Sequence, residues 1–356
     1  MCNNFRRITG IILYGGIEMK SIWKKTIVLV SLLSLAFFMS TCSKKEAPST
    51  SARPTYVFKV ATAGQPGDSL DSSLKLFLKL VNERTNGAVT GEVYAASQLG
   101  NHRDYIDGLQ MGSLQVAEIT AAVLSTVAPK FSIFDLPYIS RSPQALYDIL
   151  DGEAGDILTK HIMDVAQIRT IGWMVRTPRH VYSAKGPINT VADFRNLKIR
   201  TMESAPMLKA MTLFNAKATP IPTAERYMAL QTGVVEAAEN NVAEIYNCKE
   251  FEVTKYLSKT AHLVTPNIIC IGTKFLESLP ADYQQIIIEA GREAGAFGTQ
   301  FEINGEKDFE EKLVSEGKMI VNEVPDKSSF TGVLAPLYAE YTPTIGQDLI
   351  TLFQKQ

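Results

Sequence analysis

Residues 190–211 read TVADFRNLKIRTMESAPMLKAM, and residues 218–241 read ATPIPTAERYMALQTGVVEAAENN. The first stretch predicts a strand over 198–201 followed by a helix over 205–214, because alternating residues give way to apolar residues at helical spacing. The second predicts a helix over 223–232 and then a short apolar stretch that ends in two asparagines. Strands and helices that alternate in this way predict an α/β layer.

The same alternation extends on both sides of this stretch. Expected strands lie at 56–61, near 92–94 and at 115–119, and expected helices at 70–81 and 102–111. Pro280 then begins a long helical pattern whose apolar positions persist to Leu313, past Gly305. We therefore expect mixed α/β layers with largely parallel pairing, arranged in two units, and a helix long enough to bridge them.

Arg200 stands at the carboxyl end of the predicted strand 198–201. Strand alternation turns it away from the local core, and ligands collect at this end of the strands in open α/β sheets. A guanidinium can hold a carboxylate through two parallel charge-assisted hydrogen bonds. A solvated arginine, or an arginine paired with Glu203, would give the same pattern.

Two further arginines and one asparagine are candidates for the same site. Arg176 and Arg179 lie beside Trp173, the only tryptophan after residue 41, and two cations near an aromatic ring would suit an anionic solute. Loop arginines are more often solvated. Asn240 follows a short apolar stretch, where its amide could pair with a carboxylate or a hydroxyl. A turn or a helix cap would explain this asparagine equally well.

The first residues have the pattern of an export signal. Three lysines between residues 20 and 25 precede an apolar run over 26–41, which ends at Cys42 and a polar tract. The run is shorter than the roughly 20 residues of a membrane span, and the rest of the sequence holds no comparable stretch. A multi-pass membrane protein is therefore excluded. Met39 to Cys42 resembles a bacterial lipobox, so we expect Cys42 to be lipidated; simple cleavage nearby is the alternative. Met19 is the more natural start.

Composition and charge narrow the class of protein. With 46% hydrophobic and 21% charged residues the chain is globular and long enough for a sizeable core. Without residues 1–41 the chain keeps 31 basic and 36 acidic residues, a formal charge of about −5. An acidic chain of this kind argues against nucleic acid as a partner.

Catalytic and metal-binding patterns are lacking. Four histidines occur, none at metal spacing with another histidine or with a cysteine, and no nucleophile elbow or phosphate-binding glycine loop is present. Cys248 and Cys270 are too few for a disulfide framework, and they could pair or remain two buried thiols. We expect no catalytic residue, no metal and no cofactor.

Five segments in order resemble the solute-binding proteins of TRAP transporters, the DctP family. They are SQLGNHRDYIDGLQMGSLQ (97–115), FDLPY (134–138), LKIRTMES (197–204), ERYMALQTGVVEAAEN (225–240) and KFLESLPADYQQ (274–285). The resemblance covers residues 56–353 and implies a periplasmic-binding-protein-like α/β fold of two lobes, joined by crossing hinge strands and a long hinge-spanning helix. The implied domains are a signal peptide (1–41), a lipid-anchor linker (42–54), lobe I (55–177 plus 264–304) and lobe II (178–263 plus 305–356).

The resemblance also implies site residues. Arg200 carries over as the arginine that binds the solute's carboxylate, Arg179 as a second arginine and Asn240 as the amide of the family's QEN element. The implied ligand-binding set is completed by Arg176, Glu203, Thr223 and Tyr227. Ala238, Asn241 and Thr223 depart from the family pattern, which leaves the identity of the solute open.

The function implied is a periplasmic receptor, tethered by a lipid, that binds a small organic anion and delivers it to the small and large membrane permease subunits. A tethered sensor or scavenger with the same fold is an alternative. So is an exported enzyme that acts on carboxylates, with Arg200 holding the substrate and Glu203 or Glu239 as acid or base.

Overall fold

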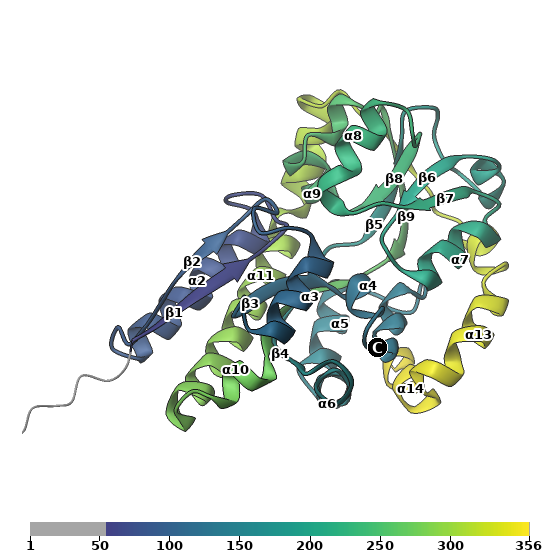
Figure 1. Cartoon of the computed structure of the whole chain (residues 1–356). Coiled ribbons are helices and arrows are strands. Elements are labelled where there is room, and N and C mark those ends of the chain that lie inside the picture. Colours follow the sequence, from purple (N-terminus) through teal and green to yellow (C-terminus); the bar gives the residue numbers. More distant parts are fainter. Residues whose placement is uncertain (1–54, 356) are drawn as a thin grey trace, which may run out of the picture. The chain divides into compact units, whose positions relative to one another are not determined.

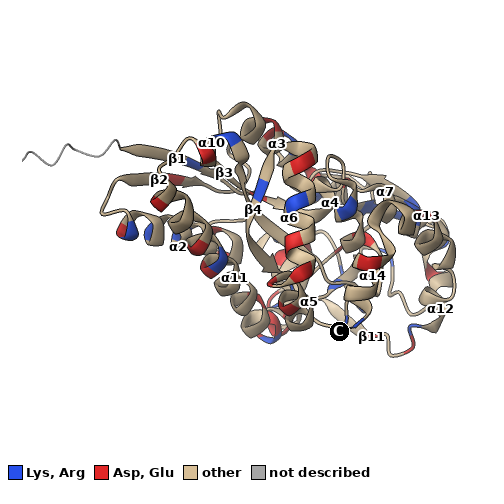
Figure 2. Cartoon of the chain, turned by 90° about the horizontal axis from the view of Figure 1, so that it is seen from below, with Lys and Arg blue, Asp and Glu red and all other residues tan. Residues whose placement is uncertain are grey.

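The computed structural model describes residues 55–355, which belong to one compact unit. The predicted signal peptide, the linker and Cys42 lie outside the described residues. Among the described residues, no helix is both long enough and apolar enough to cross a membrane. The longest one, α11 (Ala281–Ser315), carries charged side chains along its length (Figure 2).

Two mixed sheets form the centres of two lobes, which confirms the predicted fold class (Figure 1). Lobe I contains the sheet β2-β1-β3-β10-β4, and lobe II contains the sheet β11-β9-β5-β8-β6-β7. The strands of lobe I are β1 (Tyr56–Ala61), β2 (Val89–Tyr94), β3 (Val116–Thr120), β4 (Ile168–Val175) and β10 (Pro266–Gly272). Those of lobe II are β5 (Arg179–Ser183), β6 (Lys198–Thr201), β7 (Lys217–Pro220), β8 (Ala237–Asn240), β9 (Tyr256–Leu263) and β11 (Ile320–Glu323).

Helices connect these strands along the chain. Between strands of lobe I the chain forms α2 (Ser69–Arg84), α3 (His102–Met111), α4 (Ala121–Leu124), η1 (Pro129–Asp135), α5 (Pro143–Leu150) and α6 (Glu153–Ala166). Between strands of lobe II it forms η2 (Val191–Phe194), α7 (Ala205–Leu213), η3 (Thr223–Glu225), α8 (Arg226–Gln231), α9 (Val242–Asn247) and η4 (Glu250–Glu252). After β10 come α10 (Thr273–Glu277) and α11, and the chain ends with α12 (Ser328–Thr331), α13 (Ala335–Ile345) and α14 (Gln347–Gln354).

The prediction of largely parallel pairing is wrong for two strands. All pairs formed by β5 and β10 are antiparallel, whereas β1–β2, β1–β3, β6–β7, β6–β8 and β9–β11 are parallel. The chain runs from β4 of lobe I into β5 of lobe II, and from β9 of lobe II into β10 of lobe I, without a helix between them. A strand that enters its sheet directly from the other lobe runs opposite to strands reached through a crossover helix.

Helix α11 packs closely on the edge strand of lobe I. It contacts β4 and α2 in lobe I and α9 in lobe II, so the prediction of a long bridging helix is confirmed (Figure 1). A Cβ atom added to Gly172 of β4 would lie 2.2 Å from the carbonyl oxygen of Gly291 in α11. The two backbones can approach this closely only because neither glycine has a side chain.

We expect Gly172→Ala to lower the free energy of unfolding by about 1–3 kcal/mol, because the added methyl group forces β4 and α11 apart. Urea unfolding followed by circular dichroism measures the change. The control is Gly186→Ala, where an added Cβ meets no atom within 4 Å. Equal stability of the two variants would contradict the close packing.

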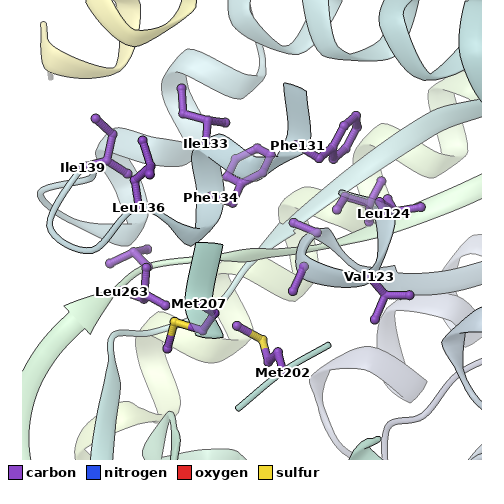
Figure 3. Packing of buried hydrophobic residues seen from close by; sticks show 14 of the residues in the cluster. Val123, Leu124, Phe131, Ile133, Phe134, Leu136, Ile139, Met202, Met207 and Leu263 are labelled. Atoms are coloured by element: carbon purple, nitrogen blue, oxygen red, sulfur yellow. The ribbon is translucent and has the colours of Figure 1, made fainter. Parts of the chain in front are cut away.

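The two lobes share apolar contacts. Val123 and Leu124 of lobe I belong to the same buried cluster as Met202, Met207 and Leu263 of lobe II (Figure 3). This cluster adjoins the polar cavity described below, because Met202 belongs to the cluster and also lines the cavity.

Candidate functional site

A cavity of about 40 Å³ lies between the two sheets, where the chain passes from one lobe to the other. Its walls come from the carboxyl ends of β3, β6 and β8 and from the first residues of β5 and β10. The antiparallel entry of β5 and β10 therefore brings their first residues to the same place as the last residues of the parallel strands. The polar side chains in its wall are His102, Thr120, Arg176, Arg179, Arg200, Thr223, Arg226, Asn240, Glu244 and Asn267.

Four buried arginines line this cavity, and three of them are paired with carboxylates. Arg176 places Nη2 at 3.3 Å from Oε2 of Glu244 and Nε at 2.9 Å from Oε1 of Glu302. Arg226 places Nη2 at 3.1 Å from Oε1 of Glu244 and also pairs with Glu250. Burial lowers the pKa of both arginines, but the carboxylates outweigh this and raise the pKa of each above its ordinary value.

Arg179 is the third paired arginine. Its Nη2 donates to Oε1 of Glu239 at 2.8 Å, and its Nε donates to Oε2 of the same carboxylate. Burial raises the pKa of Glu239, but the charge of Arg179 and the hydrogen bonds from His262 and Arg179 outweigh this and hold the pKa at about 2. Glu239 is therefore an ion that neutralises Arg179.

Arg200 is different, because no carboxylate of residues 55–355 forms an ion pair with it. Its side chain is buried, its Nε donates to the carbonyl oxygen of Ile221 at 2.8 Å, and its buried Nη1 has no hydrogen-bond partner among these residues. Burial, and then the charge of Arg226, lower its pKa to about 10. At neutral pH this guanidinium is thus a buried cation whose outer nitrogens are available to an anion.

Asn240 lies beside these arginines with its amide held in one orientation. Its Oδ1 accepts hydrogen bonds from Nη1 of Arg179 at 2.8 Å and from the backbone N–H of Asn241 at 3.0 Å. The amide orientation follows from this network, since both neighbours are donors. Its Nδ2 donates to no other residue of the described chain, so it remains a donor for a solute in the cavity.

The other predicted residues lie at the cavity or outside it. Thr223 lines the cavity, and Arg200 and Thr223 also line an adjoining outer cavity of about 20 Å³ together with Glu203. The carboxylate of Glu203 pairs with Arg103 of α3, with 2.8 Å between Nε and Oε1. Tyr227 lines a wider hollow of about 310 Å³ and donates to Glu252.

The wall from lobe I was not predicted from the sequence. His102, Asn267 and Thr62 surround Glu118, whose Oε2 accepts from the hydroxyl of Thr62 at 2.8 Å. Asn267 donates to Oε1 of Glu118, and Nε2 of His102 lies 3.5 Å from that oxygen. Burial raises the pKa of Glu118, but His102 and these hydrogen bonds hold it below its ordinary value. The one sequence feature that could have indicated this wall is Glu118, a single acid within the otherwise apolar strand VAEIT.

Arg226 was also missed. It lies on the same face of α8 as Ala229 and Leu230, and all three side chains are buried. An arginine at helical spacing with buried apolar residues indicates a buried ion pair, yet its partners Glu244 and Glu250 are distant in the sequence.

The expectation about Trp173 is corrected, and one of the two alternatives left open for Cys248 and Cys270 is realised. Trp173 does not accompany the arginines: it packs against Phe131 and Phe134 and lines a separate cavity of about 90 Å³ that also contains Arg169. Cys248 and Cys270 are both free, so the alternative of a disulfide between them is not realised.

Metal binding has no support within residues 55–355, where no group of three His, Cys, Asp or Glu side chains could hold an ion. The site is instead a cavity between two α/β lobes with one uncompensated cation in its wall. Fold and site together define a class: proteins that enclose a small anion between two lobes.

Comparisons with known proteins identify the family. Residues 60–344 match the model of the DctP family, described as bacterial extracellular solute-binding protein, family 7. The chain belongs to this family and is a TRAP transporter solute-binding protein, as the sequence predicted.

Individual relatives are similar along most of their length. A solute-binding protein of Chromohalobacter salexigens is 30% identical over 269 residues, which are 76% of this chain and 80% of the relative. A TRAP periplasmic solute-binding protein from a Sulfitobacter species, solved with bound β-D-galacturonate, is 28% identical with a TM-score of 0.80, over 84% of this chain and 100% of the other. One from Roseobacter denitrificans, solved with bound β-D-glucuronate, is 26% identical with a TM-score of 0.80, over 84% of this chain and 99% of the other.

Proposed function

We propose that this protein is the extracytoplasmic receptor of a TRAP transporter, which captures a small organic acid through a salt bridge between Arg200 and a carboxylate. The observation that carries the proposal is the unpaired charge of Arg200. The other three arginines of the cavity are neutralised by buried glutamates, whereas Arg200 faces the cavity without a counter-ion among residues 55–355. A buried cation is stable only when it is paired, and a solute carboxylate provides the pair.

Other residues orient the rest of the solute. Asn240 offers Nδ2 close to the arginines, and Thr223 offers a hydroxyl on the same lobe. Arg179 acts mainly through Asn240, since four of its five N–H donors are used by Glu239 and by the amide oxygen of Asn240. Arg176 likewise belongs to a network with Glu244 and Glu302. Tyr227 lies farther out, in the hollow that adjoins the cavity.

The solute we propose is a hydroxylated sugar acid, such as a hexuronate. The wall contributed by lobe I contains His102, Thr120 and Asn267, which are polar groups that pair with hydroxyls. Hydroxyls would pair with these groups, whereas a solute with only methylene groups would gain no hydrogen bond from them. The relatives solved with galacturonate and glucuronate support the same class.

Calorimetry with a panel of acids tests this function. The protein is unfolded and refolded to remove bound solute, and then titrated with D-galacturonate, D-glucuronate and succinate. We expect one uronate to bind at least about tenfold more tightly than succinate, equivalent to about 1.4 kcal/mol. Binding of succinate alone would contradict the sugar-acid class, and binding of no acid would contradict a carboxylate receptor. Calorimetry is preferred to fluorescence because Trp173 lies outside the cavity.

Delivery to a membrane permease and a lipid anchor at Cys42 complete the proposal. The liganded, closed protein would dock on the small and large permease subunits, and the anchor would keep it at the membrane. Co-purification of the permease subunits with the tagged receptor separates transport from a sensor or scavenger role. Mass spectrometry of the mature amino terminus tests lipidation. Recovery of the bound acid unchanged after incubation distinguishes the receptor from an enzyme.

A further inference from the structure

One ion pair spans the two lobes at the outer end of the cavity. Arg103 belongs to α3 of lobe I, and Glu203 follows β6 of lobe II. Nε of Arg103 donates to Oε1 of Glu203 at 2.8 Å. The arginine side chain is 55% exposed, whereas the glutamate side chain is only 15% exposed. The arginine thus reaches from the surface of one lobe to a mostly buried acid of the other.

Glu203 lies close to the place where a solute carboxylate would bind. It lines the outer cavity of about 20 Å³ together with Arg200, and Arg200 also lines the main cavity. A free carboxylate at this position would repel an anionic solute and would compete with it for Arg200. The pair with Arg103 reduces both effects, because the guanidinium neutralises Glu203 and occupies Oε1 of its carboxylate.

Both partners are held in place by their own neighbours. Asn101 caps α3 and accepts from the N–H of Arg103 at 2.8 Å, while Asp104 accepts from the N–H of Asn101 at 2.7 Å. In lobe II, Ser204 caps α7, and its hydroxyl also donates across to Oδ2 of Asp135 in lobe I at 2.5 Å. Because the flanking backbone is already fixed, little further ordering is needed to form the pair.

We propose that Arg103 is a positioning residue for solute binding: it pairs with Glu203 across the two lobes and so makes the anionic end of the cavity acceptable to a carboxylate. The proposal rests on the function proposed above. It adds that the charge of Glu203, the acid beside Arg200, is neutralised by Arg103 of lobe I. This neutralisation therefore accompanies the approach of the two lobes.

The proposal predicts unequal effects of removing the two partners. Arg103→Ala leaves Glu203 charged and unpaired beside the solute, so we expect uronate affinity to fall at least about tenfold. Glu203→Gln removes the repelling charge together with the pair, so affinity should change by about threefold or less. Adding Glu203→Gln to Arg103→Ala should restore affinity to the level of Glu203→Gln alone.

Calorimetry with D-galacturonate and D-glucuronate measures these affinities, and circular dichroism confirms that each variant is folded. Arg84→Ala is the matched control, because Arg84 forms a surface pair with Glu293 away from the cavity. Equal, small effects of Arg103→Ala and Glu203→Gln would overturn the positioning role, as would a double variant as weak as Arg103→Ala. A wild-type protein that binds neither uronate would instead overturn the proposed solute class on which the proposal rests.

Discussion

Arg200→Ala is expected to weaken the binding of an acid solute at least about 100-fold. Nε of Arg200 is used by the carbonyl oxygen of Ile221, which leaves Nη1 and Nη2 to hold a carboxylate. A hydrogen bond to a charged group contributes about 1.5–3 kcal/mol, and a factor of ten in affinity corresponds to about 1.4 kcal/mol. Calorimetry with the uronate that the wild-type protein binds most tightly measures the loss.

Arg200→Lys separates charge from shape. Lysine keeps the positive charge but lacks the planar fork, so its affinity should lie between those of the wild-type protein and Arg200→Ala. Unchanged affinity of Arg200→Ala would show that the carboxylate binds elsewhere.

The same position should behave in the opposite way when stability is measured without solute. The pKa of Arg200 is lowered from 12.5 to about 10 by burial and by Arg226. For a cation the cost of this shift is present below the folded pKa and disappears between about pH 10 and 12.5. It corresponds to about 3 kcal/mol at neutral pH. We therefore expect Arg200→Met to bind no acid and to unfold at a higher temperature than the refolded wild-type protein, an outcome that misfolding could not produce.

The second large effect is expected at the buried pair of Arg179 and Glu239. Glu239→Gln leaves Arg179 charged and only partly paired in the interior, which should lower the free energy of unfolding by about 3–5 kcal/mol. The matched control is Glu293→Gln. Glu293 also accepts two hydrogen bonds from one arginine, through Nη1 and Nη2 of Arg84, but its side chain is 51% exposed, whereas that of Glu239 is fully buried. The surface pair should contribute less than about 1 kcal/mol. Equal losses in urea unfolding would contradict this difference.

The pH dependence of stability follows from the same residue. The pKa of Glu239 is about 2 in the folded protein, against an ordinary value of 4.5. An acid with a lowered pKa contributes stability above its unfolded pKa, and this contribution is lost as the pH falls from about 4.5 to 2. The pKa of Glu244 is also about 2, with burial opposed by Arg226 and Arg176. Unfolding measured from pH 7 to 2 should therefore show a steep loss below pH 4.5, shallower in Glu239→Gln.

The spacing of residues along the sequence predicted many of the helices and strands. The strands 56–61 and 198–201 and the helix 102–111 have the predicted bounds, because each follows from spacing within a few residues. The predicted helix 223–232 instead divides into η3 and α8. The direction of β5 and β10 was not predictable from such spacing, since it depends on which lobe the preceding strand occupies.

Pairing across long distances limited what the sequence could show about the site. The placement of Arg200 at a strand end was readable, but its lack of a counter-ion depends on Glu239, Glu244 and Glu250 pairing with other arginines. Similarly, the partner of Glu203 lies 100 residues away in the chain. The sequence thus placed Arg200 at the end of its strand, whereas its lack of a counter-ion required the three-dimensional structure.

Arg200 belongs to lobe II, whereas His102 and Asn267 of the cavity wall belong to lobe I. This separation bears on how such receptors diversify. Arg200 is fixed by the backbone of lobe II, through the carbonyl oxygen of Ile221, and does not depend on the side chains of lobe I. His102 and Asn267 in lobe I share one buried partner, Glu118. If Arg200 binds the carboxylate as proposed, exchanging these three residues together would change the solute preference and leave Arg200 in place. An attempt to change the solute preference in the laboratory would begin by substituting His102, Asn267 and Glu118 together.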